Sequence, residues 1–161
     1  MIKLMISPAA LFRVFTMIVL GAAVSFMAAS VTQGQRKADD DSVAFRNYRG
    51  IQLGMLADEV RKKLGDPRDK GDEQDFFIFG ETETAQIVYD KTHKVVTISA
   101  DFLTAGTTVP TCKQVFGAEV EAKADGSVYK MVRFPKAGYW LSYNRTSGNS
   151  PLTTVTLQKI Q

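Results

Sequence analysis

Apolar residues at a spacing of four mark the first regular element that follows the N-terminal region. Leu56, Val60 and Leu64 recur at this spacing, and mostly charged residues occupy the positions between them. Such a spacing places the apolar side chains on one face of a helix. Gly65 follows, with a proline two residues later, and both residue types end helices. The pattern predicts a surface helix over residues 56–64 that docks one edge onto a larger body.

Alternation with a period of two follows this helix in several segments. In residues 94–103, Val96, Ile98 and Phe102 alternate with small polar residues. This period predicts strands of a sheet that is buried on one face. Short loops between neighbouring segments are typical of antiparallel hairpins. The predicted strands cover residues 75–80, 85–90, 94–103, 127–134, 138–143 and 153–160.

The helix and the first three strands have a counterpart 52 residues further along the chain. This shift places Val60 on Cys112. It also places Phe77 on Tyr129. Because apolar positions and turn glycines coincide while charged positions do not, the pattern indicates a duplication. The expected fold class is α+β, a tandem repeat of a short helix followed by an antiparallel meander, with the helices packed on one face of the sheet.

The N-terminal region has the pattern of an export signal. Two cations, Lys3 and Arg13, precede an uncharged apolar stretch over residues 14–29 that ends in small residues. This order is typical of a secretory signal peptide, and cleavage is expected near residues 30–34. The alternative is an uncleaved anchor, because residues 11–29 are nearly long enough to cross a bilayer. The mature protein is expected in the periplasm or outside the cell, without a lipid anchor, since no cysteine lies near the cleavage region.

Four segments are therefore predicted along the chain. The polar run that follows the signal has no periodic apolar residues, and its three consecutive aspartates are expected to be solvated. The predicted segments are a signal peptide over residues 1–30, a disordered leader over residues 31–42, a first helix-plus-meander repeat over residues 43–104 and a second over residues 105–161.

A glycine-based motif around the predicted helix resembles a known bacterial family. The motif consists of Gly50 to Met55, Val60, and Leu64 to Pro67, and an aromatic-rich meander follows it. It resembles the module shared by outer-membrane assembly lipoproteins of the SmpA/OmlA type (BamE-like) and the β-lactamase-inhibitor proteins, and the doubled pattern is similar to that of the inhibitors. The resemblance implies a non-catalytic envelope protein that binds other proteins through a sheet face. The lipidated cysteine of the assembly lipoproteins has no counterpart here.

The charge balance depends on the export signal. The full chain has 20 Lys and Arg against 17 Asp and Glu and a pI near 9.0. Removal of the two cations in the signal segment leaves 18 against 17. A chain this close to neutrality is not typical of nucleic-acid binders, because phosphate neutralisation needs clustered Lys and Arg.

Residues that could carry chemistry are few. The only histidine, His93, is expected at the tip of a turn, a poor place for a triad or a zinc site. The only cysteine, Cys112, matches Val60 in the repeat and is expected to be a buried, inert thiol, with a dimer disulfide or a reactive thiol as the alternative. No catalytic residue, cofactor or metal site is predicted, although spacing alone leaves a pair of carboxylates for glycoside hydrolysis open. Four aspartates at every third position lack the EF-hand order and are expected in a solvated loop: Asp66, Asp69, Asp72 and Asp75.

The candidate binding residues lie on two neighbouring strands of the second repeat. If Leu141 and Tyr143 point toward the helices, alternation sends Trp140 to the opposite face. The same alternation exposes three residues of the preceding strand, and these residue types are enriched in binding hot spots. The alternatives are that the leader, a second sheet or a dimer partner covers this face, or that the two faces are reversed. The predicted binding residues are Tyr129, Met131, Arg133 and Trp140.

These observations favour a non-catalytic exported envelope protein that binds another protein, as an adaptor or an inhibitor-like module. One alternative is a small periplasmic enzyme that uses carboxylates with Tyr or Arg. The other is a purely structural component of the envelope.

Overall fold

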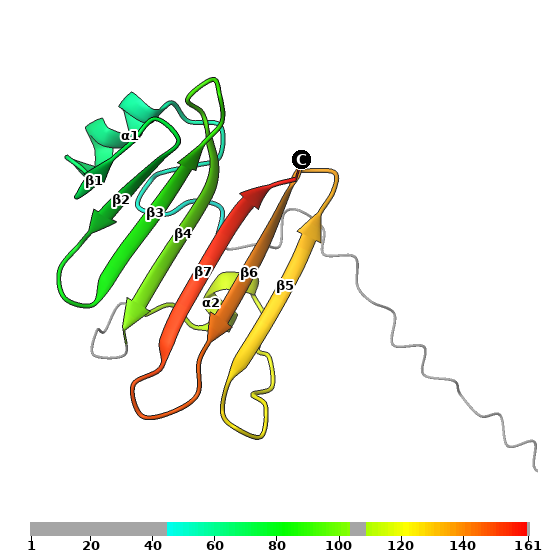
Figure 1. Ribbon diagram of the computed structural model, residues 1–161. Helices are drawn as coiled ribbons and strands as arrows, with labels where there is room; N and C mark the ends of the chain where they lie inside the picture. Colours follow the sequence, from blue (N-terminus) through cyan, green and yellow to red (C-terminus); the bar gives the residue numbers. More distant parts are fainter. Residues whose placement is uncertain (1–44, 104–108, 161) are drawn as a thin grey trace, which may run out of the picture. The chain divides into compact units, whose positions relative to one another are not determined.

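A single seven-stranded antiparallel sheet organises residues 45–103 and 109–160, which are the residues that the computed structural model describes (Figure 1). The spatial order of the strands is β1-β2-β3-β4-β7-β6-β5. Two short helices, α1 (Ala57–Leu64) and α2 (Cys112–Phe116), lie behind the sheet in Figure 1. The strands are β1 (Asp69–Lys70), β2 (Gln74–Ile78), β3 (Glu83–Tyr89), β4 (Val95–Leu103), β5 (Val128–Phe134), β6 (Tyr139–Arg145) and β7 (Leu152–Lys159).

The predicted helix and the six predicted strands are all present, with bounds within two residues of those expected. Strand β1 was not predicted, because a strand of two residues carries no periodic signal. The predictions of a signal peptide over residues 1–30 and of a leader over residues 31–42 lie outside the described residues. The predicted boundary between residues 104 and 105 lies there too.

The predicted fold class, an α+β tandem repeat of helix-plus-meander units, is wrong. Strand β4 pairs with β7 from Thr97 to Leu103, so that both meanders belong to one sheet with one core. The helices contain only eight and five residues and do not define separate units. The shift of 52 residues also fails inside the strands, because Phe77 is buried while its supposed counterpart Tyr129 is 52% exposed. An offset that is wrong by one residue exchanges the two faces of a strand.

The buried face of the sheet, called the inner face below, carries the core. Residues at every second position of the strands are buried on it, and Ala57 and Val60 of α1 are buried as well. Cys112 of α2 is also buried in this core, as predicted. A reciprocal pair of hydrogen bonds begins α2, since Thr111 Oγ1 accepts from Gln114 N–H at 3.2 Å and Gln114 Oε1 accepts from Thr111 N–H at 2.7 Å. The opposite face of the sheet is called the outer face.

The turn between β3 and β4 holds His93, which is exposed there as expected. Its backbone φ is +57°, and Asp90 Oδ1 accepts hydrogen bonds from the nearby Thr92 N–H and Lys94 N–H at 2.8 and 3.1 Å. Such a turn is stabilised by its own aspartate and brings no second ligand to the imidazole.

Candidate binding surface

The four predicted binding residues lie together on the outer face of β5 and β6. Arg133 pairs directly with Trp140, and Met131 pairs with Ser142. Tyr129 and Met131 are 52% and 47% exposed, Arg133 is exposed and Trp140 is half-buried. Cross-strand neighbours on one face lie about 5 Å apart, so these side chains form one continuous surface. We call Tyr129, Met131, Arg133 and Trp140 the outer patch.

The facing of these strands agrees with the alternation in the sequence. Leu141 and Tyr143 are buried on the inner face, which leaves Trp140 on the outer face. On β5, Val128 and Phe134 are buried at the two ends of the strand. The predicted orientation of the two strands is therefore confirmed, whereas the binding role of the outer patch stays a prediction.

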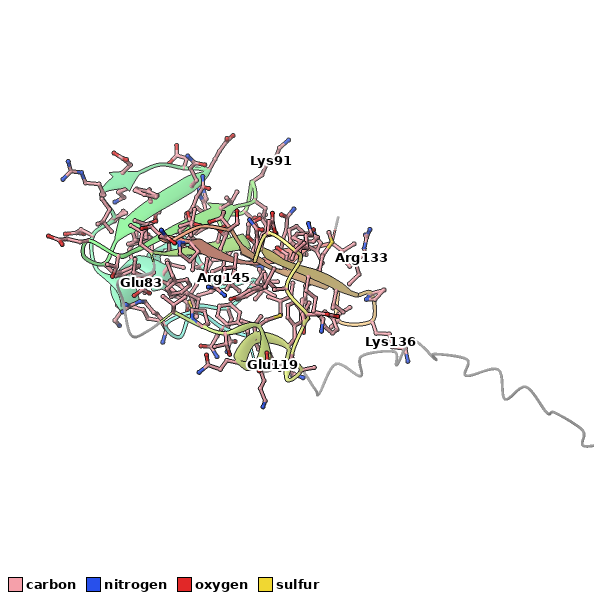
Figure 2. The ribbon with its side chains drawn as sticks, turned by 90° about the horizontal axis from the view of Figure 1, so that it is seen from below. Glu83, Lys91, Glu119, Arg133, Lys136 and Arg145 are labelled. Carbon is pink, nitrogen blue, oxygen red and sulfur yellow. The ribbon has the colours of Figure 1, made fainter. Side chains whose placement is uncertain are left out.

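The outer patch carries one cation, Arg133, and Lys136 lies in the turn that follows β5. Within the described part of the chain, no ion pair involves Arg133 or Lys136, and both residues are exposed. Both extend away from the sheet in Figure 2. A guanidinium that lies beside an indole and has no carboxylate partner is available to a carboxylate on another molecule.

The middle of the outer face differs from the patch because its polar groups satisfy one another. The hydroxyls of Ser99 and Thr156, on β4 and β7, lie 3.1 Å apart and share a hydrogen bond. Next to them, Thr154 Oγ1 donates to Asp101 Oδ1 at 2.6 Å. Strands β4 and β7 therefore offer few unpaired polar groups on the outer face. Among β4, β7, β6 and β5, the exposed aromatic and sulfur-containing side chains of this face are concentrated on β5 and β6.

The inner face contains a buried carboxylate that the sequence did not identify. Asp75 is fully buried, and its carboxylate accepts hydrogen bonds from Arg61 Nε at 2.9 Å and Nη2 at 3.0 Å. Tyr89 Oη donates to the same carboxylate at 2.7 Å, and Gly71 N–H donates at 3.2 Å. Burial by itself raises the pKa of Asp75, but the hydrogen bonds from Arg61 and Tyr89 outweigh it and lower the pKa below the ordinary value.

Gly71 contributes to this cluster through its lack of a side chain. A Cβ atom at this position would lie 2.8 Å from the carbonyl oxygen of Gln74, which is closer than van der Waals contact allows. The tight approach lets the Gly71 carbonyl oxygen accept from Arg61 Nη2 at 3.0 Å while its N–H faces Asp75. The turn between β1 and β2 thus closes over the ion pair.

A second buried carboxylate, Glu83, lies at the start of β3. Glu83 Oε1 accepts from Tyr48 Oη at 2.7 Å and from Arg49 Nε at 2.9 Å, while Oε2 accepts from Arg49 Nη2 at 2.7 Å. The hydrogen bonds from Arg49 lower the pKa of Glu83 against the opposing effect of burial. Burial, together with the hydrogen bond to Glu83, raises the pKa of Tyr48 above its ordinary value.

The two buried carboxylates do not converge on a common site. Glu83 lies four residues along β3 from Ile87, the partner of Asp75, so about 13 Å separates the two positions at about 3.3 Å per residue. Each carboxylate is engaged by its own arginine and tyrosine, and no buried side-chain nitrogen or oxygen of the described residues lacks a partner. Both clusters therefore act as structural ion pairs.

The expectation that Asp75 is part of a solvated loop is wrong, although Asp66, Asp69 and Asp72 are exposed as predicted. A usable signal was present in the alternation itself. Asp75 lies two residues before Phe77, on the same face of β2, and Glu83 lies two residues before Ala85. Extension of the buried period by one step would have placed both acids inside, where an unpaired carboxylate is costly and a cationic partner is required.

A cavity of about 410 Å³ opens between the α2 region and the inner face. Cys112 and Tyr143 line it, together with Arg145 and Glu119, which are labelled in Figure 2. Burial raises the pKa of the Cys112 thiol, which disfavours the nucleophilic thiolate. The electrostatics of this cavity therefore do not activate its thiol as a nucleophile.

Across residues 45–103 and 109–160, no three His, Cys, Asp or Glu side chains are grouped so that they could hold a metal ion. In the same residues no helix has the length and apolar character needed to cross a membrane. A scan against protein-family models and searches of curated proteins and of solved structures found no match to this chain.

Proposed function

We propose that this chain is a non-catalytic, exported protein of the bacterial envelope that binds another protein through the outer patch, as an adaptor or an inhibitor-like module. The observation that carries the proposal is the juxtaposition of exposed Tyr129 and Met131 with Arg133 and Trp140 on one sheet face. Interface hot spots are enriched in Trp, Tyr and Arg, and Met is enriched in interfaces generally.

The partner is a protein surface that combines apolar groups with a carboxylate. Tyr129, Met131 and Trp140 supply apolar area, and Arg133 supplies a planar cation that binds a carboxylate through two parallel hydrogen bonds. An isolated Arg at the rim of an interface contributes little, but here the neighbouring indole and aromatic side chains would exclude water from the charged contact. The polar middle of the face supplies the rim.

The resemblance to the BamE-like and inhibitor-type module points to the same role, apart from the doubled helix-plus-meander architecture that the single sheet overturns. Export is part of the proposal and has its own test. The protein recovered from a periplasmic fraction should have an intact mass that corresponds to a start between Val31 and Gln35. A full-length species found only in membranes would contradict export with cleavage.

The partner-binding test compares two aromatic truncations on the same face. Trp140→Ala removes the indole of the outer patch, whereas Phe76→Ala removes an aromatic ring on β2, about 19 Å away across four strand spacings of about 4.8 Å. Proteins captured from envelope extract by the unchanged chain are identified first, and their affinities for each variant are then measured.

Trp140→Ala should weaken the affinity of a specific partner by about 30-fold, which corresponds to about 2 kcal/mol, if the indole is a hot spot. Phe76→Ala should leave that affinity within about twofold. Equal affinities for the unchanged chain and Trp140→Ala would place the binding surface elsewhere.

The alternative of a carboxylate enzyme receives no support from a specific observation. The two buried acids of the described residues, Asp75 and Glu83, lie apart and are each engaged by an arginine and a tyrosine. A purely structural role makes the opposite prediction for the outer patch, since Trp140→Ala would then change no binding affinity.

A further inference from the structure

Strand β5 forms one edge of the sheet, and within the described ranges no strand pairs with its free side. It is seven residues long, and its register with β6 runs unbroken from Val128 to Phe134. The opposite edge is the two-residue strand β1. A long, regular edge presents unpaired N–H and C=O groups that can template another strand, whereas a very short edge strand cannot.

The backbone of β5 shows which residues face that free side. The carbonyl oxygen of Phe134 accepts hydrogen bonds from Ala137 N–H at 3.1 Å and Gly138 N–H at 2.9 Å, inside the hairpin to β6. Since the backbone groups of successive residues point to opposite sides of a strand, Val132 and Lys130 also face β6. The N–H and C=O groups of Tyr129, Met131 and Arg133 therefore face the free edge.

We propose that β5 pairs with β5 of a second copy of this chain, in antiparallel orientation, around a two-fold axis at Met131. In this register Met131 lies opposite Met131 of the second copy, and Tyr129 lies opposite Arg133 of the second copy. The Tyr129–Arg133 pair occurs twice around the axis, and in these two pairs and the Met131 pair the backbone groups of the two copies point at each other. The outer face then places each tyrosine ring beside a guanidinium, a favourable cation–π arrangement.

Side chains on the inner face fit the same register. Val128 lies opposite Phe134 of the second copy, and Lys130 lies opposite Val132 of the second copy. No two like charges are directly opposed in this pairing. A shift of the axis to Lys130 would place two lysines opposite each other, which destabilises a strand pair. A shift to Val132 would bring Pro135, which has no N–H, opposite Tyr129 and shorten the ladder.

The contact is small, and this sets the expected affinity. One seven-residue edge is far below the roughly 20 to 30 residues per side of a standard interface. The dimer should therefore be weak, with a dissociation constant of about 10 to 100 μM. The pairing rests on the edge of β5 and does not depend on the proposed partner of the outer patch, but it would join the two outer patches at Met131.

Sedimentation velocity tests the pairing. The protein is expressed from the full sequence, and the form that accumulates in the cells, with or without the N-terminal segment, is purified. Between about 1 μM and 1 mM the unchanged chain should shift from monomer to dimer. Met131→Lys and Met131→Glu should each weaken the dimer at least tenfold, because each places two like charges at the axis. An equimolar mixture of the two variants should restore the dimer, since each introduced lysine then faces an introduced glutamate.

Ser142→Lys is the matched control, because Ser142 lies opposite Met131 on β6 and receives the same charge one strand away from the edge. It should dimerise like the unchanged chain. Monomer at every concentration, absence of rescue in the mixture, or equal weakening by Ser142→Lys would each overturn the proposal. A protein that stays monomeric but protects the amides of the β5 edge from hydrogen exchange would show that another segment of the chain covers this edge. That result would also overturn the proposal.

The same measurements separate this proposal from the proposed function. Trp140→Ala leaves the edge of β5 unchanged and should retain the dimer while it loses partner affinity. Loss of partner binding with an intact dimer, or the reverse, identifies which of the two proposals has failed.

Discussion

The two faces of the sheet use the same residue types for different purposes. On the inner face, Tyr89 and Arg61 both bind Asp75. On the outer face, Tyr129 and Arg133 have no carboxylate opposite them in the described register of β5 and β6. The comparison teaches that the role of an arginine or tyrosine depends on its neighbours. With an acid beside it the residue holds the fold together, and without one it is available to bind another molecule.

Electrostatics explains why the inner clusters are closed. A buried carboxylate without partners would lose its hydration and shift toward the neutral form. The hydrogen bonds around Asp75 prevent this, and they also raise the pKa of Arg61 above its ordinary value. Arg61, Asp75 and Tyr89 are engaged by one another, so this cluster has no charge to offer a ligand.

The largest expected effect comes from breaking an inner cluster. Asp75→Ala leaves the Arg61 guanidinium and the Tyr89 hydroxyl without their acceptor, and Arg61 is largely covered. We expect the free energy of unfolding to fall by about 3 to 5 kcal/mol, as for other broken buried ion pairs. Urea denaturation provides the measurement, with the exposed Asp72→Ala as the control that should change stability by about 0.5 kcal/mol or less. Similar values for both variants would contradict the structural role of Asp75.

Two adjacent residues of β6 give the next effect and test the facing directly. Leu141 is fully buried, so Leu141→Ala should lower the free energy of unfolding by about 2 to 5 kcal/mol. Trp140 is half-buried on the outer face, so Trp140→Ala should cost only about 1 kcal/mol despite the larger side chain. Thermal and urea unfolding of the two variants measure the difference. A larger loss for Trp140→Ala than for Leu141→Ala would mean that the two faces have been exchanged.

The acid dependence of stability should be a smaller and graded effect. The folded state lowers the pKa of both Asp75 and Glu83, so their ion pairs stabilise the fold above the unfolded pKa values of about 4. This stabilisation should be lost as the pH falls from about 4 through the lower folded pKa values. Urea midpoints between about pH 6 and pH 2 measure it. Glu83→Gln should make the loss of stability with falling pH less steep. An equally steep loss in that variant would mean that Glu83 does not contribute to it.

Most of the secondary structure could be predicted because it depends on local periodicity. The spacing of Leu56, Val60 and Leu64 identified α1, and alternation identified β2 to β7 and the exposed side of Trp140. The error in the fold class has a physical origin as well. Helix and strand periods say which face is apolar, but they do not say that β4 and β7 are neighbours, and this pairing makes one sheet of two meanders.

The sequence by itself determined the position of the strands and the outward facing of Trp140, because both depend on a period of two within a few neighbouring residues. Only the tertiary structure decided the partners. Arg61 reaches Asp75 across 14 residues, and Arg49 reaches Glu83 across 34. A buried charge requires a partner of opposite charge, but the residues around it in the sequence do not specify which one. The partner is the opposite charge that the folded chain brings next to it.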